Sequence, residues 1–347
     1  MSTHLALPEV DLRSDTVTRP TAAMRAAMHA AAVGDDVFGE DPGVNALEAR
    51  IAAELDMAAA LFVPSGTMSN LLALLTHCQR GDEYIAGGEA HTYKFEAGGG
   101  AVLGGIQPQP VPFAADGSLP LDAVAAVIKP DDFHFARTRL VCLENTQNGL
   151  PLSLAYLAAW SAFCVERGLA RHLDGARLFN AAVALDVPAR EIARCFDTVS
   201  VCFSKGLGAP VGSALCGPAP FIERARRWRK MVGGGMRQAG SLAAAASHAL
   251  DHHVARLADD HRRAQQLADA LQAIPACAGK VRCATNMVYL DLDAATLAAI
   301  AGHHRARGIR VAERARLVLH LDVDDAGLAR VIDAYRAFFA AGGATDQ

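Results

Sequence analysis

Short apolar runs alternate with segments of helical periodicity through the first two thirds of the chain. The apolar runs predict strands at residues 60–63, 83–86, 101–103, 140–143, 170–173, 198–203 and 212–216. The segments between them predict helices at residues 67–78, 119–128, 154–167 and 177–185. This alternation is typical of an α/β fold with a mostly parallel central sheet and helices on both faces. Such sheets bind their ligands beyond the carboxyl ends of the strands.

After residue 237 the pattern changes. One long alanine-rich helix is predicted over residues 238–271, followed by strands at 287–292, 308–311 and 317–321 and a last helix at 326–341. This part predicts a second, smaller α/β domain. We therefore expect three parts: an N-terminal arm over residues 1–14, a large domain over 15–250 and a small domain over 251–347.

Composition limits the class of protein. The chain has 347 residues, of which 52% are hydrophobic, so it can bury a large core and is not intrinsically disordered. Its net charge of −4 and its 6% aromatic content argue against nucleic acid as a partner. No apolar run reaches membrane-spanning length, so no membrane partner is expected. The start of the chain lacks a signal-peptide pattern and the eight cysteines form no C-x-x-C pair, which predicts a cytoplasmic protein.

A lysine follows the strand predicted at residues 198–203. Ser204 and Lys205 come directly after it, and glycines follow at once. Most lysines are solvated surface charges, but a lysine at the mouth of a buried strand is partly desolvated. Desolvation lowers its pKa and allows it to form a Schiff base.

A carboxylate follows another predicted strand, in the sequence HLDGAR. Asp174 and Lys205 at two strand ends are what pyridoxal 5′-phosphate requires, because the carboxylate keeps the pyridine nitrogen protonated while the lysine holds the cofactor. Asp-Gly is also an ordinary turn, so this motif alone is weak evidence and indicates a cofactor site only together with Lys205.

A small-residue turn, PSGTMSN at residues 64–70, leads from a predicted strand into a helix. Gly66 and Thr67 would present backbone N–H groups and the helix dipole to a phosphate. A plain helix cap is the alternative. The turn is neither a Walker loop nor G-x-G-x-x-G, which disfavours ATP and NAD. Together, the three motifs predict one pyridoxal-phosphate site.

Two histidines are further candidates. His91 has the chemistry to stack on a pyridine ring, and a hydrogen-bonded loop histidine is the alternative. His134 stands between two phenylalanines, so it is either a substrate contact or a packed core histidine.

The cationic run at residues 224–230 is explained mostly by a solvated helix face, whereas the glycine-rich loop that ends in Arg237 is of a kind that approaches anions. His248 and His252 have metal-binding spacing, but no third ligand suggests itself, so no metal site is predicted.

Nine stretches, in order along almost the whole chain, resemble the low-specificity L-threonine aldolases. These are pyridoxal-phosphate enzymes with the aspartate aminotransferase fold (fold type I), and beta-eliminating lyases share several of the motifs more loosely. The residues before Asp11 precede the first match and are expected to form a leader. The matching stretches are DLRSDTVTRPT (11–21), GDDVFGEDPGVNALE (34–48), PSGTMSN (64–70), HTYKFEAGGGAVLGGIQPQP (91–110), DDFHFARTRLVCLENT (131–146), LDGARLFNA (173–181), SKGLGAPVGS (204–213), RWRKMVGGGMRQAG (227–240) and LVLHLDV (317–323).

The resemblance implies a role for each matching residue around the cofactor. Lys205 forms the Schiff base, Asp174 pairs with the pyridinium nitrogen and Arg177 contacts the ring 3′-oxygen. The remaining cofactor contacts implied are the phosphate ligands Gly66, Thr67 and Ser204, the ring-stacking His91, and Lys230 and Arg237 from a neighbouring subunit.

Substrate contacts and assembly are implied in the same way. Ser14 and Arg316 would bind the substrate carboxylate, with Arg177 close by, while His91 and His134 would face the substrate. The partners expected are a small amino-acid substrate and further copies of the chain, in a homotetramer built from two dimers with shared active sites.

The activity implied is cleavage of L-threonine, L-allo-threonine and other β-hydroxy-α-amino acids to glycine and an aldehyde. The base that acts on the hydroxyl is His91, His134 or a water held by them. An amino-acid racemase or a β-eliminating lyase on the same fold remains an alternative. A non-catalytic regulator would be expected to lack Lys205, Asp174 or the carboxylate arginine, and all three are present.

Overall fold

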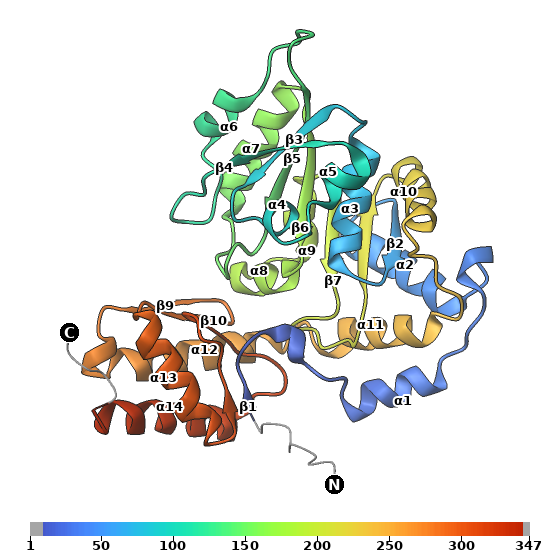
Figure 1. The fold of residues 1–347 in the computed structure, drawn as a ribbon. Helices are drawn as coiled ribbons and strands as arrows, with labels where there is room; N and C mark the ends of the chain where they lie inside the picture. The colour runs from blue at the N-terminus through green and yellow to red at the C-terminus, as the bar shows by residue number, and fades with distance from the viewer. Residues whose placement is uncertain (1–9, 343–347) are drawn as a thin grey trace. The chain divides into compact units, whose positions relative to one another are not determined.

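A computed structural model describes residues 10–342, so most of the expected leader lies outside the described residues. The chain forms two compact units. Residues 20–254 make the large unit (Figure 1). The small unit combines the described residues up to Arg19 with those from Ala255 onward. Residues 10–19 therefore group with the C-terminal part of the chain.

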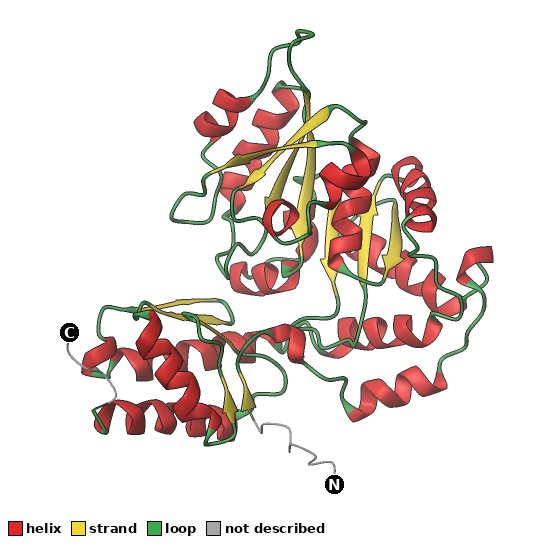
Figure 2. Cartoon of the chain, viewed as in Figure 1, coloured by secondary structure: helices red, strands yellow, loops and turns green. Residues whose placement is uncertain are grey.

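The large unit is built on a seven-stranded sheet (Figure 2). The order is β2-β8-β7-β6-β5-β3-β4. Neighbours are parallel from β7 through β6, β5 and β3 to β4, whereas β8 is antiparallel to both β7 and β2. The predicted mostly parallel α/β sheet is thus confirmed. The strands are β2 (Ala59–Val63), β3 (Asp82–Gly87), β4 (Gln107–Val111), β5 (Arg137–Glu144), β6 (Ala170–Gly175), β7 (Thr198–Cys202) and β8 (Ser213–Gly217).

Helices cover this sheet, and α3 (Gly66–His77) has the central place among them. Ser65 caps its first turn by accepting a hydrogen bond from the Met68 backbone N–H. Its buried leucines pack in two core clusters, one over β2 and β8 and one over β3 and β5. The other helices of the large unit are α1 (Ala22–Ala30), α2 (Pro42–Glu54), α4 (His91–Lys94), α5 (Gly99–Gly104), α6 (Leu121–Val127), α7 (Leu154–Glu166), α8 (Leu178–Leu185), α9 (Ala189–Ala193), α10 (Ala219–Met231) and α11 (Gly240–His252), with the short 3-10 turn η2 (Asp36–Phe38).

The predicted strand at 101–103 is wrong, because these residues lie in α5. Val102 is 77% exposed, so the apolar run does not mark a buried strand. The edge strand is instead β4, whose sequence is QPQPV. Proline has no backbone N–H, which is tolerated on an edge strand because one side of the strand faces no partner.

The single helix predicted over 238–271 is also wrong. The structure ends α11 at His252 and begins α12 (Leu257–Gln272) after four intervening residues. Neither glycine nor proline marks the break, and the alanine-rich pattern continues through it. His253 is buried and its Nδ1 lies 2.6 Å from the Leu207 carbonyl oxygen, a tertiary contact that local sequence does not reveal.

The small unit contains two short sheets. One is antiparallel, in the order β12-β10-β9, and the other pairs β1 with β11 in parallel. Its core gathers around buried Tyr335, Leu271 and Val288. Its elements are β1 (Val10–Asp11), η1 (Asp15–Val17), α12, η3 (Pro275–Cys277), β9 (Val281–Ala284), β10 (Met287–Leu290), α13 (Ala294–Arg305), β11 (Ile309–Arg310), β12 (Arg316–Val318) and α14 (Asp325–Ala340). Across both units, none of the described helices has the length and apolar character needed to cross a bilayer.

Candidate active site

Four parallel strands of the large unit end at the same edge of its sheet, and the predicted site residues follow those ends. Asp174 lies near the end of β6 and is the register partner of Glu144 at the end of β5. His91 opens α4 just after β3, and Lys205 comes three residues after β7. The topology therefore brings these side chains to one place, as the sequence predicts.

Asp174 is a buried carboxylate with donors on both oxygens. Its side chain accepts a hydrogen bond from Asn70 Nδ2 at 2.8 Å on Oδ2 and from the Ala176 backbone N–H at 3.1 Å on Oδ1. A buried anion near the end of a strand is the group that a protonated pyridine nitrogen requires.

Two further candidates, Lys205 and Arg177, interact electrostatically with Glu144, the register partner of Asp174. Burial, and after it the neighbouring charge of Asp174, raise the pKa of Glu144 to about 7. Lys205 and Arg177 act in the opposite direction on the same carboxyl group. Lys205 also lowers the pKa of His91. The charges of Lys205 and Arg177 therefore act on Glu144, and that of Lys205 also acts on His91.

His91 is held from two sides. Its backbone N–H donates to Glu144 Oε2 at 2.8 Å, and its Nδ1 lies 2.7 Å from Glu96 Oε1. The hydrogen bond to Glu96 raises the pKa of His91, and the negative charge of Asp174 adds to the effect. The His91 side chain is 39% exposed, whereas the Glu96 side chain is buried. The ring is thus fixed at one edge and open at the other.

The start of α3 lies close to Ser204, the second residue after the end of β7. A Cβ atom added at Gly66 would lie 3.4 Å from Cys202 Sγ, which is 3.8 Å from Ser204 Oγ. The first turn of α3, with Gly66 and Thr67, carries backbone N–H groups without helical partners. Gly66 and Ser204 therefore both lie next to Cys202, and Thr67 follows Gly66 in the same turn.

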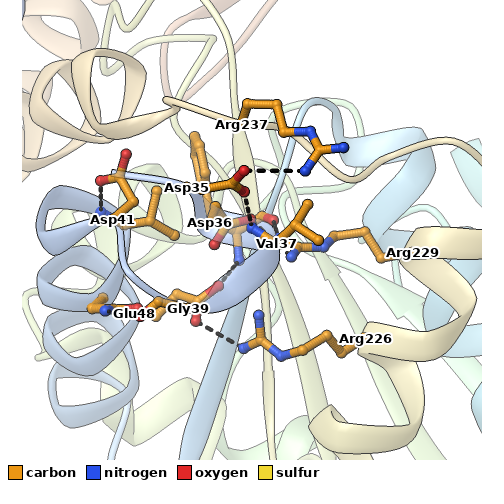
Figure 3. Close-up of polar contacts among 12 residues, drawn as sticks. Asp35, Asp36, Val37, Gly39, Asp41, Glu48, Arg226, Arg229 and Arg237 are labelled. Carbon is orange, nitrogen blue, oxygen red and sulfur yellow. Dashed lines mark hydrogen bonds and ion pairs between the residues drawn. The ribbon is translucent and has the colours of Figure 1, made fainter. Parts of the chain in front are cut away.

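The cationic run on α10 has a structural role that its sequence did not suggest. Figure 3 shows Arg229 and Arg237 facing Asp36 and Asp35, and Arg226 facing Glu48 of α2. Arg229 is buried, pairs with Asp36 at 2.8 Å and donates to the Phe62 carbonyl oxygen at 2.8 Å. Arg237 pairs with Asp35 at 3.1 Å. The interpretation as a solvated helix face is wrong for Arg229, whose acidic partner lies far away in the sequence.

His134 lies at the opposite end of the sheet from His91. It sits on an exposed loop before β5, with its Nδ1 2.6 Å from Asp132 Oδ1. The eight residues of β5 separate this loop from Glu144, a span of roughly 20–25 Å. Within one chain, the structure therefore does not bring His134 to His91 and Asp174, and it does not pack His134 in the core.

Ser14 and Arg316, the predicted ligands of the substrate carboxylate, both belong to the small unit. Ser14 caps η1 by accepting a hydrogen bond from the Thr16 backbone N–H at 3.3 Å. Arg316 begins β12. The Val318 backbone N–H donates to the Leu12 carbonyl oxygen at 2.9 Å, so the segment before Ser14 lies beside β12.

Sequence reasoning missed four polar residues of the site. Asn70, Glu96, Glu144 and His172 are all tied to the predicted residues by contact or by charge. Two local signals were available, since His172 points to the same face of β6 as Asp174 and Glu96 comes only five residues after His91. His91, Glu96 and Asp174 also offer possible metal-ligand atoms within 4.8 Å of one another, but Asn70 already bridges the two carboxylates.

Buried histidines make the fold sensitive to acid. Burial lowers the pKa of His172 to about 4, so this side chain is neutral in the folded protein, while the unfolded chain takes up a proton near pH 6.5. The free energy of unfolding should therefore fall as the pH drops from 6.5 towards 4, with His172 contributing roughly 3 kcal/mol at most. Thermal unfolding at several pH values should show a smaller decline for His172→Gln. The matched change at exposed His29, His29→Gln, should leave the decline as in the wild type, and equal slopes for all three proteins would contradict the assignment.

The fold and this site together define a pyridoxal-phosphate-dependent enzyme of fold type I. The residues present fit the chemistry of the cofactor, since a buried carboxylate could pair with its ring nitrogen, a lysine could hold its aldehyde carbon and a helix N-terminus could meet its phosphate. Comparisons with known proteins agree. The beta-eliminating lyase family matches residues 11–295.

The chain belongs to the low-specificity L-threonine aldolase family. It is 54% identical over 333 residues to the low specificity L-threonine aldolase of Escherichia coli (strain K12), covering 95% of this chain and 99% of that one. It is 46% identical to probable low-specificity L-threonine aldolase 2 of Arabidopsis thaliana, with 84% of each chain covered. A crystal structure from Exiguobacterium sp. 255-15, described as a putative aromatic amino acid beta-eliminating lyase/threonine aldolase, has a TM-score of 0.77 at 26% identity and covers 94% of this chain and 97% of that one.

Proposed function

We propose that this protein cleaves L-threonine, L-allo-threonine and related β-hydroxy-α-amino acids to glycine and an aldehyde. The observation that carries the proposal is the buried, doubly hydrogen-bonded Asp174 carboxylate beside Lys205 and His91. Pyridoxal phosphate supplies, when bound, an acceptor for the electron pair left on Cα as the Cα–Cβ bond breaks. The family relationship supports the same reaction.

The protein's own residues divide the remaining work. Lys205 would hold the cofactor covalently through Nζ, and Asp174 would keep a proton on the ring nitrogen. His91 would take the proton from the substrate hydroxyl, because its Nδ1 is engaged by Glu96 and its open edge leaves Nε2 available. General-base assistance of this kind is worth about 10²–10⁴-fold in rate.

Product analysis tests the proposed function against the other reactions of this fold. Purified holoenzyme incubated with L-threonine should give glycine and acetaldehyde in equal amounts. D-allo-threonine, which inversion at Cα alone would give, would indicate a racemase, and a keto acid with ammonia would indicate a β-eliminating lyase. Either result would overturn the proposal.

Arg316→Ala tests the proposed carboxylate contact. An arginine binds a carboxylate through two parallel hydrogen bonds, so its loss should raise KM for L-threonine by about 10- to 100-fold. The visible absorption of the bound cofactor should not change. Arg314→Ala, in the same segment, is the matched control. If KM barely moves for Arg316→Ala but rises for Arg314→Ala or Arg310→Ala, the contact belongs to that arginine instead.

Assembly is the other part of the proposal. We infer a homotetramer of two dimers, in which Lys230 and Arg237 reach the cofactor phosphate of a neighbouring subunit. A phosphate carries close to two negative charges, which Gly66, Thr67 and Ser204 meet with neutral donors. Arg237 is 59% exposed and pairs with Asp35, so it would exchange the Asp35 carboxylate for the cofactor phosphate.

The cysteines bear on the location of the protein. Seven of the eight are buried free thiols, which supports a cytoplasmic location.

Arg237→Ala should weaken both cofactor retention and subunit association. Ligands that bind only the assembled state stabilise that state, so apoenzyme should also dissociate at higher concentration than holoenzyme. Sedimentation across a dilution series would measure this, with the exposed Arg227→Ala of the same cationic run as control. A holoenzyme that stays fully active as a monomer would exclude shared sites.

A further inference from the structure

Asn70 joins the two acidic side chains of the active site. Its side-chain amide nitrogen donates to Asp174 Oδ2 and to Glu96 Oε1, each at 2.8 Å. All three side chains are buried. Glu96 in turn holds the Nδ1 edge of His91 at 2.7 Å. A single amide therefore connects the carboxylate assigned to the cofactor nitrogen with the pair assigned to the substrate hydroxyl.

Three further buried or half-buried side chains are connected to Asn70 in one line by successive hydrogen bonds. His172 Nε2 lies 3.2 Å from Asn70 Oδ1, and His172 Nδ1 lies 2.9 Å from Thr198 Oγ1. The same hydroxyl is 2.8 Å from His77 Nε2. The line crosses from β6 to β7 and back to α3, and no proposed step of the reaction uses it.

The direction of each hydrogen bond in this line follows from the carboxylates. Because both carboxylates accept, the NH₂ group of Asn70 must face them and its oxygen must face His172. Burial lowers the pKa of His172 to about 4 and that of His77 to about 3, so both rings are neutral. His172 then donates from Nε2 and accepts at Nδ1 from the Thr198 hydroxyl, and His77 donates to Thr198. Every donor finds one acceptor.

We propose that Asn70 is a positioning residue that couples Asp174 to the His91–Glu96 pair, and that His172, Thr198 and His77 fix the orientation of its amide. The inference rests on the proposed function for the roles of Asp174 and His91. The contacts themselves stand independently of it. A flipped amide would point its oxygen at two carboxylates, so the orientation of Asn70 decides whether both are held in place.

Coupling through Asn70 predicts a change in the titration of His91. The charged groups that act on His91 are Glu96 and Asp174, which raise its pKa, and Lys205, which lowers it. The Asn70 amide lowers the pKa of Glu96 and so favours its anionic form. Without that amide Glu96 is ionised less readily, and the His91 pKa falls.

Asn70→Ala in the holoenzyme is the first test. The acid limb of the pH profile of kcat/KM should move to lower pH by about 0.5–1 unit, a part of the 1–3 units that a neighbouring opposite charge contributes. The kcat should fall by about 10- to 100-fold, the range for one hydrogen bond to a charged group, with a smaller change in KM. Cofactor release after dilution should be faster, because Asp174 loses a donor.

Thr198→Val keeps the test decisive if Asn70→Ala folds poorly. Valine has nearly the shape of threonine and removes only the hydroxyl, so Asn70 stays while its support is lost. The shift of the acid limb, the fall in kcat and the faster cofactor release should all appear, but each should be smaller than in Asn70→Ala. Asn286→Ala is the matched control, since Asn286 is a buried asparagine whose amide donates to the Leu319 carbonyl oxygen in the small unit. It should leave the acid limb unmoved.

The proposal is overturned if both test variants keep the wild-type acid limb and cofactor release rate, or if Asn286→Ala shifts the limb equally. Cofactor release needs no substrate. Suppose that the wild-type protein binds cofactor but does not cleave threonine, and that both test variants release cofactor faster than the wild type. This result would refute the proposed function and still support the positioning role of Asn70.

Discussion

Lys205→Ala should abolish the visible absorption of the lysine-bound cofactor and lower cleavage of L-threonine by about 10³-fold or more. The nitrogen that holds the cofactor is lost, while the position just beyond β7 tolerates a smaller side chain. Absorption spectra and a coupled aldehyde assay would measure both effects. Borohydride should trap cofactor on the wild-type protein and not on the variant.

Two further substitutions test whether the effect of Lys205→Ala is specific to the lysine side chain at this position. Lys205→Arg should fail as well, because a guanidinium does not form the covalent bond to the cofactor. Lys280→Ala, which changes an exposed lysine of the small unit, should behave as the wild type. Near-normal cleavage of L-threonine by Lys205→Ala would show that Lys205 does not hold the cofactor.

Asp174→Asn should reduce kcat by about 10²- to 10³-fold, because a neutral amide no longer holds a proton on the ring nitrogen. Cofactor binding should weaken but remain detectable. The structure gives a second reason, since both Asp174 oxygens accept hydrogen bonds from N–H groups. The NH₂ group of an asparagine would face one of these donors in either orientation.

A matched control for Asp174→Asn lies at the other end of the sheet. Asp82 is a buried aspartate at the start of β3 that pairs with Arg137 at 2.9 Å. Asp82→Asn should lower the thermal midpoint without changing kcat. If Asp174→Asn kept the wild-type kcat, the carboxylate would have no part in the electron-accepting role of the cofactor.

The sequence predicted the residues that follow strand ends better than the contacts between them. Lys205, Asp174 and the turn before α3 could be found because each directly follows an apolar run, and parallel strands bring such positions together. Asn70 lies 104 residues from Asp174 and Arg229 pairs with Asp36 across the large unit, so no local pattern reveals their roles. The strand β4 was missed because two prolines disguise it. Chain order already places His134 before the strand predicted at residues 140–143, and its substrate contact, which the family resemblance implies, stays a prediction.

The parallel pairing of β1 with β11 has a consequence for how the chain folds during synthesis. Val10 and Asp11 pair with Ile309 and Arg310, residues made about 300 positions later. At 5–20 residues per second the ribosome needs roughly 15–60 s to produce the second strand. The large unit, whose residues are contiguous, can begin to fold in that interval. The first strand must wait without its partner, so the small unit is completed late and exposes an unpaired edge to chaperones until then.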